Sequence, residues 1–277
     1  MNSGDEIKRY LIHAFMVLLG LIAIIPIYLV LINATRSTEQ INLGISILPS
    51  TYTFYNWGIL TGRGFQIFQG FGNSAFISIN TTILSIYFSA MTAYGLHVYR
   101  FKGRMILWSV ILIIIMLPST LSIIGFYQFI AKIKLRGSYI PLIVPGIAAA
   151  GTVLFIRQYM MSVLSMELVD AARMDGAGEY RIFNVIILPV IIPALAAQSI
   201  FTFVGSWNNF VTPFILLSDE KRYTLPMLVQ NLRGNIYRAE YGAIYLGIAI
   251  SLIPIILFYS FMSRFIISGL TMGGLKE

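Results

Sequence analysis

Long apolar runs separated by shorter polar segments set the pattern of this sequence. Six of the runs are about 17 to 25 residues long, and a helix that crosses the hydrocarbon core of a bilayer needs about 20 apolar residues. The pattern therefore predicts an all-α integral membrane protein with six transmembrane helices in one domain of residues 1–277. We expect the helices at residues 11–32, 75–98, 105–129, 140–156, 182–204 and 241–263.

Proline falls inside most of the expected helices. Membrane helices tolerate proline because neighbouring helices satisfy the carbonyl groups that it frees. Kinks that serve packing and hinges of a moving transport domain both agree with this pattern. The residues concerned are Pro26, Pro118, Pro145, Pro189, Pro193 and Pro254.

Composition supports the membrane assignment. The chain is 57% hydrophobic and 11% charged, whereas an average soluble domain is about 25% charged. Its net charge of +8 does not indicate nucleic acid, because the basic residues are scattered among the connectors rather than gathered in a stripe. Attraction to anionic membrane lipid accounts for most of them. They divide almost evenly between the two sides of the membrane, so charge alone does not fix the orientation.

Several kinds of chemistry are missing from the sequence. No G-x-x-x-x-G-K-[ST] motif is present to cradle the phosphates of ATP. With no cysteine and only His13 and His97, a zinc site is not expected. None of the six runs contains Asp or Glu, which ion-driven carriers often use inside the membrane. We therefore expect a partner to supply the energy, with an ion-coupled carrier or channel, or a polytopic membrane enzyme, as the alternatives.

A charged segment at about residues 162–181 separates the fourth and fifth runs. Charge is costly in hydrocarbon, so this segment should lie outside the bilayer. Helix-forming residues lead up to Gly176, which is a typical helix stop, and two small residues, Ala171 and Ala172, allow close approach of another protein. The pattern predicts a short polar helix that docks on a partner. Its charged residues are Glu167, Asp170, Arg173, Asp175, Glu179 and Arg181.

The same segment resembles a known motif. Asp170-Ala171-Ala172, then Asp175-Gly176-Ala177, Phe183, Leu188-Pro189 and Pro193 are similar to the EAA loop of ABC importer permeases. The departure is aspartate at position 170, where the family usually has glutamate; the charge is kept. Further segments occur in the order found in carbohydrate permeases of the maltose-transporter type, in the shorter of the two permease subunits. They are Asn73-Ser74, Ala93-Tyr94-Gly95, residues 100–104 and residues 206–210.

This resemblance implies a type I ABC importer permease fold with the EAA helix as a coupling helix. The partners would be a homologous second permease, two ATP-binding subunits and an extracellular or periplasmic solute-binding protein. ATP and Mg would be bound by the ATPase, with no cofactor in this chain. The chain would lie in a prokaryotic plasma (inner) membrane, with its N-terminus and EAA loop in the cytoplasm, and would import a saccharide, more readily an oligosaccharide. The residues that would couple to the ATPase are Glu167, Asp170, Ala171, Ala172, Asp175, Gly176 and Ala177.

A second set of residues has the chemistry to line a sugar pathway. Trp207 offers an aromatic face for stacking, and Asn208 and Asn209 offer donors and acceptors for hydroxyl groups. The alternative is an interfacial anchor at Trp207 with asparagines that cap a helix or turn. Tyr127 and Gln128 admit the same two interpretations, with simple packing favoured.

Three basic residues, Lys132, Lys134 and Arg136, fall on the outer side in the favoured orientation, against the usual distribution of positive charge. Contact with acidic residues of the binding protein or second permease would explain them. Attraction of an acidic sugar would explain them as well. In the opposite orientation the three residues would be cytoplasmic.

Overall fold

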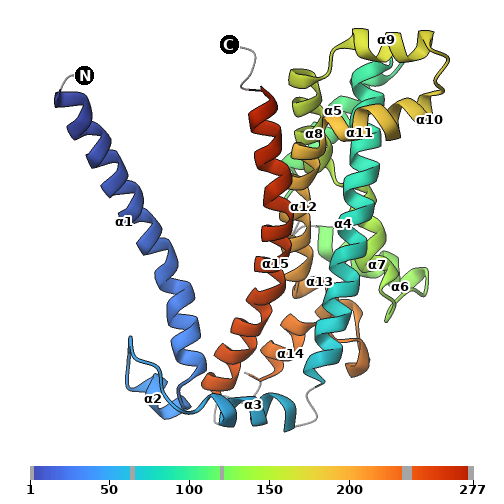
Figure 1. Ribbon diagram of the computed structural model, residues 1–277. Helices are drawn as coiled ribbons and strands as arrows, with labels where there is room; N and C mark the ends of the chain where they lie inside the picture. Colours follow the sequence, from blue (N-terminus) through green and yellow to red (C-terminus); the bar gives the residue numbers. More distant parts are fainter. Residues whose placement is uncertain (1–2, 63–65, 119–121, 233–238, 274–277) are drawn as a thin grey trace. The chain divides into compact units, whose positions relative to one another are not determined.

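The computed structural model describes residues 3–62, 66–118, 122–232 and 239–273, which form helices and connecting turns without a strand (Figure 1). The chain divides into two compact units. The first unit consists of Met1–Ile67 with Leu228–Ile253, and the second consists of Phe68–Met227 with Pro254–Glu277. The all-helical prediction is confirmed within the described residues.

Four helical stretches are long and apolar enough to cross a membrane, and a bent pair of helices, either a broken span or a re-entrant loop, meets the same criteria when its two parts are taken together. The continuous stretches are Lys8–Ala34, Ile67–Val98, Ile140–Val163 and Tyr241–Ile266. The bent pair is Glu179–Val190 with Ile192–Trp207, which meet at 80°. In the described part of the chain, four of the six expected runs thus correspond to continuous stretches of spanning length and the fifth run to the bent pair, whereas the third run is different.

The prediction of one helix over residues 105–129 for the third run is wrong. Helix α5 covers Arg104–Met116, and a separate helix α6 covers Ile123–Lys132. Leu117 is extended, with φ −77° and ψ 129°, because it precedes Pro118, whose ring disfavours helical backbone in the residue before it. The proline therefore ends the helix rather than only kinking it.

The fourth and fifth runs contain irregular helix. The fourth consists of α7 (Ile140–Ile143), the 3-10 helix η2 (Val144–Ala148) and α8 (Ala150–Val163). The fifth begins with α10 (Glu179–Arg181) and the π-helix η3 (Ile182–Ile187) and continues with α11 (Leu188–Val190) and α12 (Ile192–Trp207). The 80° bend falls at Ile191, between Pro189 and Pro193, where proline removes backbone donors.

The first unit contains one long helix, two short helices that follow it, and the first part of the last helix. These are α1 (Ser3–Ala34), α2 (Thr38–Asn42), α3 (Thr53–Gly62) and the first part of α15 (Tyr241–Gly273). The buried Asn56 amide donates to the carbonyls of Ala34 at 2.9 Å and Arg36 at 3.0 Å. A Cβ on Gly242 would lie 2.3 Å from the Arg36 carbonyl oxygen, so only glycine permits this approach.

The second unit is built along α4 (Ile67–Val98), which carries a polar cluster at each end. At its start, the Asn73 amide donates to the carbonyls of Lys221 and Tyr223, at 3.0 and 2.9 Å. At its far end, Tyr94 lies in a second polar cluster. These two points are 21 residues apart in the numbering, or about 32 Å along a helix, which matches a hydrocarbon core of about 30 Å.

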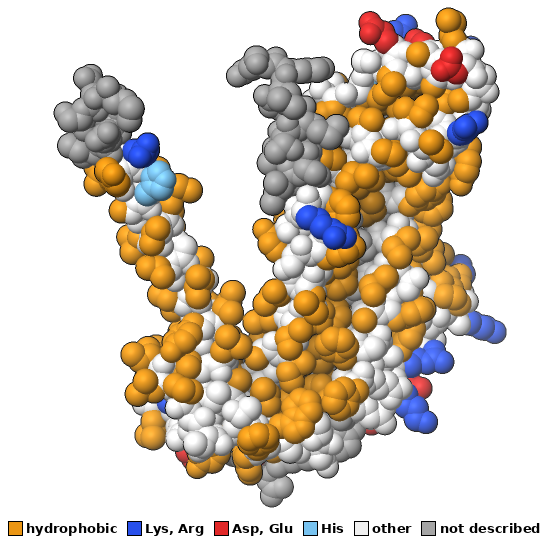
Figure 2. All heavy atoms as spheres, in the orientation of Figure 1, with side chains coloured by type: hydrophobic (Ala, Val, Ile, Leu, Met, Phe, Trp, Pro, Cys, Tyr) orange, Lys and Arg blue, Asp and Glu red, His pale blue; other side chains and the backbone are white. Residues whose placement is uncertain are grey.

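Figure 2 shows this arrangement on the surface of the second unit, where hydrophobic side chains cover the middle and charged side chains gather around α9 (Met166–Met174) and beside α6. The remaining short helices of this unit are α13 (Val211–Leu216) and η4 (Glu220–Arg222), followed by α14 (Leu225–Asn231), which continues into the first unit.

Close packing of η2 on α4 yields a testable prediction. A Cβ on Gly146 would lie 2.9 Å from Thr81 Cγ2 and 3.3 Å from the Thr81 carbonyl oxygen. We expect Gly146→Ala to destabilise the protein by about 1–3 kcal/mol, because the neighbouring backbone must move. Thermal unfolding in detergent measures this effect. Gly151→Ala is the control, since a Cβ there meets nothing within 4 Å. Equal unfolding temperatures for the two variants would refute this packing.

Candidate functional site

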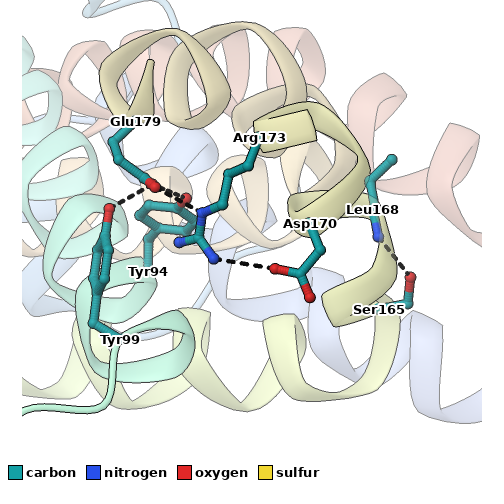
Figure 3. Close-up of polar contacts among 7 residues, drawn as sticks. All are labelled: Tyr94, Tyr99, Ser165, Leu168, Asp170, Arg173 and Glu179. Atoms are coloured by element: carbon teal, nitrogen blue, oxygen red, sulfur yellow. Dashed lines mark hydrogen bonds and ion pairs between the residues drawn. The ribbon is translucent and has the colours of Figure 1, made fainter. Parts of the chain in front are cut away.

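Helix α9 lies in the charged segment between the fourth and fifth runs, and its ends are stabilised locally. The Ser165 hydroxyl accepts a hydrogen bond from the Leu168 N–H at 3.4 Å, which caps the first turn (Figure 3). Glu167 lies in the first turn and Arg173 in the last. Both charges have the sign that the helix dipole favours at those positions. The sequence therefore specifies a short but well-defined helix here.

The chain leaves α9 through a Schellman motif. The N–H of Ala177 donates to the Ala172 carbonyl, and the N–H of Gly176 donates to the Arg173 carbonyl, both at 3.0 Å. Gly176 has φ +78°, which a residue with a Cβ adopts only at a cost. The predicted helix stop at Gly176 is confirmed, and it sets the direction in which the chain returns to α10.

The two alanines of the motif lie on different faces of α9. Ala172 is 6% exposed and, with Val169, belongs to the hydrophobic core of the second unit. Ala171 is exposed. We expected both alanines to lie against a partner, but Ala172 instead holds α9 on its own core. The exposed face carries Glu167, Leu168, Ala171, Met174 and Asp175, and the side chain of Met174 is 89% exposed.

A polar network ties α9 to the end of α4 (Figure 3). Arg173 Nε donates to Glu179 Oε1 at 2.7 Å, and another Arg173 nitrogen donates to Asp170 Oδ1 at 3.1 Å. The other Glu179 oxygen, Oε2, accepts from the hydroxyl of Tyr94 at 3.1 Å and from that of Tyr99 at 2.5 Å. Glu179 thus uses both of its oxygens to join α9, α10 and the end of α4.

Electrostatics keep this network in one protonation state near neutral pH. The hydrogen bond from Arg173 to Glu179 raises the pKa of the Arg173 guanidinium, so this group remains charged. Burial, followed by the hydrogen bond to Glu179, raises the pKa of the Tyr99 hydroxyl, so it remains a neutral donor. Arg173 also lies over the Tyr99 ring, 5.8 Å from its centroid.

Sequence reasoning did not assign Tyr94, Tyr99, Arg173 and Glu179 to the site. In the sequence, Arg173 and Glu179 stand out only as charges, and Tyr94 only as part of a segment that matches carbohydrate permeases. The sequence does carry one signal for the ion pair of Arg173 and Glu179. These two residues lie on either side of the Gly176 turn, and this turn brings their side chains, six residues apart, into contact. The tyrosines come from a segment more than 70 residues earlier, and their part depends on tertiary packing.

The residues predicted for a sugar pathway do not form one exposed site. Trp207 is 1% exposed and packs edge-on against Phe71 and stacked against Phe203. Its ring is therefore a core side chain in this structure rather than an open stacking surface. Asn209 Oδ1 accepts from the Thr212 N–H at 3.3 Å near the start of α13, whereas Asn208 is exposed at the end of α12.

Tyr127 and Gln128 lie on α6, next to the predicted outer basic cluster of Lys132, Lys134 and Arg136. Gln128 and all three basic residues are exposed, and the Arg136 guanidinium lies 5.1 Å from the centroid of the Tyr127 ring. Arg222 donates to the Gly137 carbonyl, which brings the η4 turn with its Lys221 to the same end of the unit. Asp219 is 3.9 Å from Arg222, so the added charge is partly offset.

Among the described residues, no group of three His, Cys, Asp or Glu side chains is placed to hold a metal ion. Neither histidine belongs to the polar network at α9. Around α9, a short, capped helix presents one exposed face of mixed apolar and acidic side chains.

Comparison with known proteins places this chain in a family. Residues 85–271 match the model of the binding-protein-dependent transport system inner membrane component family. The chain is 37% identical over 278 aligned residues to the arabinooligosaccharides transport system permease protein AraQ of Halalkalibacterium halodurans, covering 99% of each chain. It is 34% identical to the protein of the same name from Bacillus subtilis, covering 98% of this chain and 97% of that one.

A solved structure shares the fold. It is the crystal structure of a bacterial ABC transporter involved in the import of the acidic polysaccharide alginate. One of its chains superposes with a TM-score of 0.78 at 21% identity, over 95% of this chain and 98% of that one. Together with the family match, the superposition gives the helices described above the fold of an importer permease. The chain belongs to the binding-protein-dependent transport system inner membrane component family and is a multi-pass membrane-transport subunit of an ABC importer, not an enzyme.

Proposed function

We propose that this chain forms half of the translocation pathway of an ATP-driven importer for oligosaccharides. The observation that carries the substrate class is the 37% identity, along 99% of both chains, to a permease named for arabinooligosaccharides. Other relatives are named for diacetylchitobiose and for galactooligosaccharides, at 29% and 31% identity. The other half of the pathway is a homologous permease, and two ATPases, which bind ATP and Mg, and a solute-binding protein complete the importer.

The proposed topology is a single transmembrane domain of residues 1–277 with six crossings. The α5–α6 region makes the third crossing as a broken helix, and the bent pair makes the fifth. The N-terminus and α9 lie in the cytoplasm, while α6 and η4 lie outside. Support comes from the two polar ends of α4, which are separated by about the thickness of the hydrocarbon core.

Helix α9 is the proposed contact with the ATPase. Its exposed face offers an apolar centre at Ala171 and Met174 between the acidic residues Glu167 and Asp175, which suits a cleft with basic edges. Asp170 and Ala177 flank this face, and Gly176 sets the exit of the chain. Closure of the ATPases would move α9, and the bonds of Glu179 would carry the movement to α4.

Reconstitution tests the proposed function. The permease pair with its ATPases and binding protein in liposomes should take up oligosaccharides that the binding protein retains, and only when ATP is supplied. The chain alone should hydrolyse no ATP. Uptake that continues without ATP but collapses with an ion gradient would instead favour a secondary carrier. Amino acids or metals as the only tight ligands of the binding protein would overturn the substrate class.

The turn after α9 gives a prediction with an internal control. Gly176→Val forces a β-branched residue into φ +78°, at a cost of about 1–2 kcal/mol, and should displace α9. We expect loss of ATPase binding or of ATP-driven uptake, with membrane insertion retained. Gly178→Val is the matched control, because Gly178 has φ −69° and open space around it. If Gly176→Val assembles and transports as well as Gly178→Val, the role of this turn is refuted.

The polar network gives a second prediction. Glu179→Gln removes the charge that holds Arg173, and Tyr99→Phe removes one donor to Glu179. Both should leave ATP hydrolysis intact but lower the number of sugars transported per ATP, because α9 would move without α4. Arg181→Gln is the control, since Arg181 is exposed and makes no hydrogen bond or ion pair with the described residues. Unchanged coupling in Glu179→Gln would show that the network only stabilises the fold.

The outer basic cluster gives a third prediction. Replacing Lys132, Lys134 and Arg136 together with Gln should slow association of the binding protein, and more so at low salt, because exposed charges are screened beyond about 8–10 Å at physiological ionic strength. Stopped-flow association rates measure this effect. Equal losses for neutral and acidic saccharides favour docking of the binding protein, whereas a loss confined to acidic saccharides favours attraction of substrate. No loss at any salt concentration rules out both.

A further inference from the structure

An apolar groove lies between the end of α4 and the first turns of α5, within the second unit. Its volume is about 520 Å³, and its lining is almost entirely apolar. Leu107 and Val110 on its α5 side are half exposed, so the groove is open on the apolar surface of the chain. The α4 side includes Thr92, Gly95, Leu96 and Tyr99.

One end of the groove is strongly basic. The turn from α4 to α5 carries three cations within five residues, Arg100, Lys102 and Arg104, and all three line an adjoining hollow. Arg100 lines both cavities and so joins them. Arg100 and Lys102 are exposed, and among the described residues no carboxylate lies within salt-bridge distance of any of the three.

Nearby groups add to the positive potential and do not neutralise it. The Arg157 guanidinium lies over the Trp108 ring of α5, 4.1 Å from its centroid, and its Nε has no hydrogen-bond partner among the described residues. Glu179, the carboxylate bonded to the neighbouring Tyr99, is already bonded to Arg173 and Tyr94 as well. The basic turn therefore retains an unbalanced charge at the boundary of the apolar surface.

We propose that this groove is a binding site for an anionic glycerophospholipid. One acyl chain would lie between α4 and α5, and the phosphate would be held by Arg100, Lys102 and Arg104. Charge complementarity selects an anionic headgroup, and the continuity of the basic hollow with an apolar groove selects a lipid over a soluble phosphate, which would use only the basic half. This inference needs only a membrane protein and does not depend on the substrate of the importer.

Native mass spectrometry of the assembled importer, released from nanodiscs of phosphatidylcholine with a fraction of phosphatidylglycerol, tests the site. The triple variant Arg100→Gln/Lys102→Gln/Arg104→Gln should retain at least about tenfold less phosphatidylglycerol, since each juxtamembrane cation contributes about fivefold. The matched control is Lys132→Gln/Lys134→Gln/Arg136→Gln, which removes the same charge at the other end of the unit and should retain the lipid.

A second variant separates a lipid site from a patch of charge. Gly95→Leu places a side chain in the groove, where a Cβ meets nothing within 4 Å, and leaves every cation in place. It should also lower retention of phosphatidylglycerol. Arg100→Lys/Arg104→Lys, which keeps the positive charge that the triple Gln variant removes, should retain the lipid. Equal losses in both triple variants, full retention in Gly95→Leu, or displacement of the lipid by millimolar glycerol phosphate would each overturn the proposal.

Discussion

The cost of placing charge in hydrocarbon is the constraint on which the second unit depends. Among the described residues, its charged side chains that bond to distant elements lie near the two ends of α4. Glu179 bonds to Tyr94 and Tyr99 at one end, and Arg222, in the η4 turn that Asn73 contacts, bonds to the Gly137 carbonyl at the other. The middle of the helix makes only uncharged bonds to distant elements among the described residues, from Thr81 to the Leu142 carbonyl and from Tyr87 to Asn184. This part of the helix is lined by small hydroxyl residues that pack closely, as at Thr81 against Gly146. The charged groups proposed to bind a partner or a lipid headgroup lie at these two ends of the unit.

At one end of the unit, polar and apolar contacts together hold α9 in place. The helix is only nine residues long and would not be stable alone, so its position depends on its surroundings. Val169 and Ala172 bury one face in the core, the Schellman motif fixes the exit, and Glu179 fixes the orientation. Three sets of contacts therefore hold α9 against the rest of the second unit.

Much of this fold could be predicted from the sequence, because span length and helix stops are local properties. Gly176 is a good example, since one residue type satisfies the required backbone angle. The break after Met116 was missed because a proline can either kink a membrane helix or end it, and packing decides which. The burial of Trp207 against Phe71 and Phe203 is a tertiary contact that a single sequence does not encode by spacing. The same holds for the hydrogen bonds of Glu179 with Tyr94 of α4 and with Tyr99, which directly follows that helix.

The most direct test of the account asks what the exposed face of α9 touches. The chain contains no cysteine, so a single cysteine can carry a photoreactive label at a chosen position. In the assembled importer, a label at Ala171→Cys should crosslink to the ATPase, and a label at Gln128→Cys on α6, at the opposite end of the unit, should not. Crosslinking to the ATPase from position 128, or from neither position, would contradict the assignment of α9 as the coupling helix.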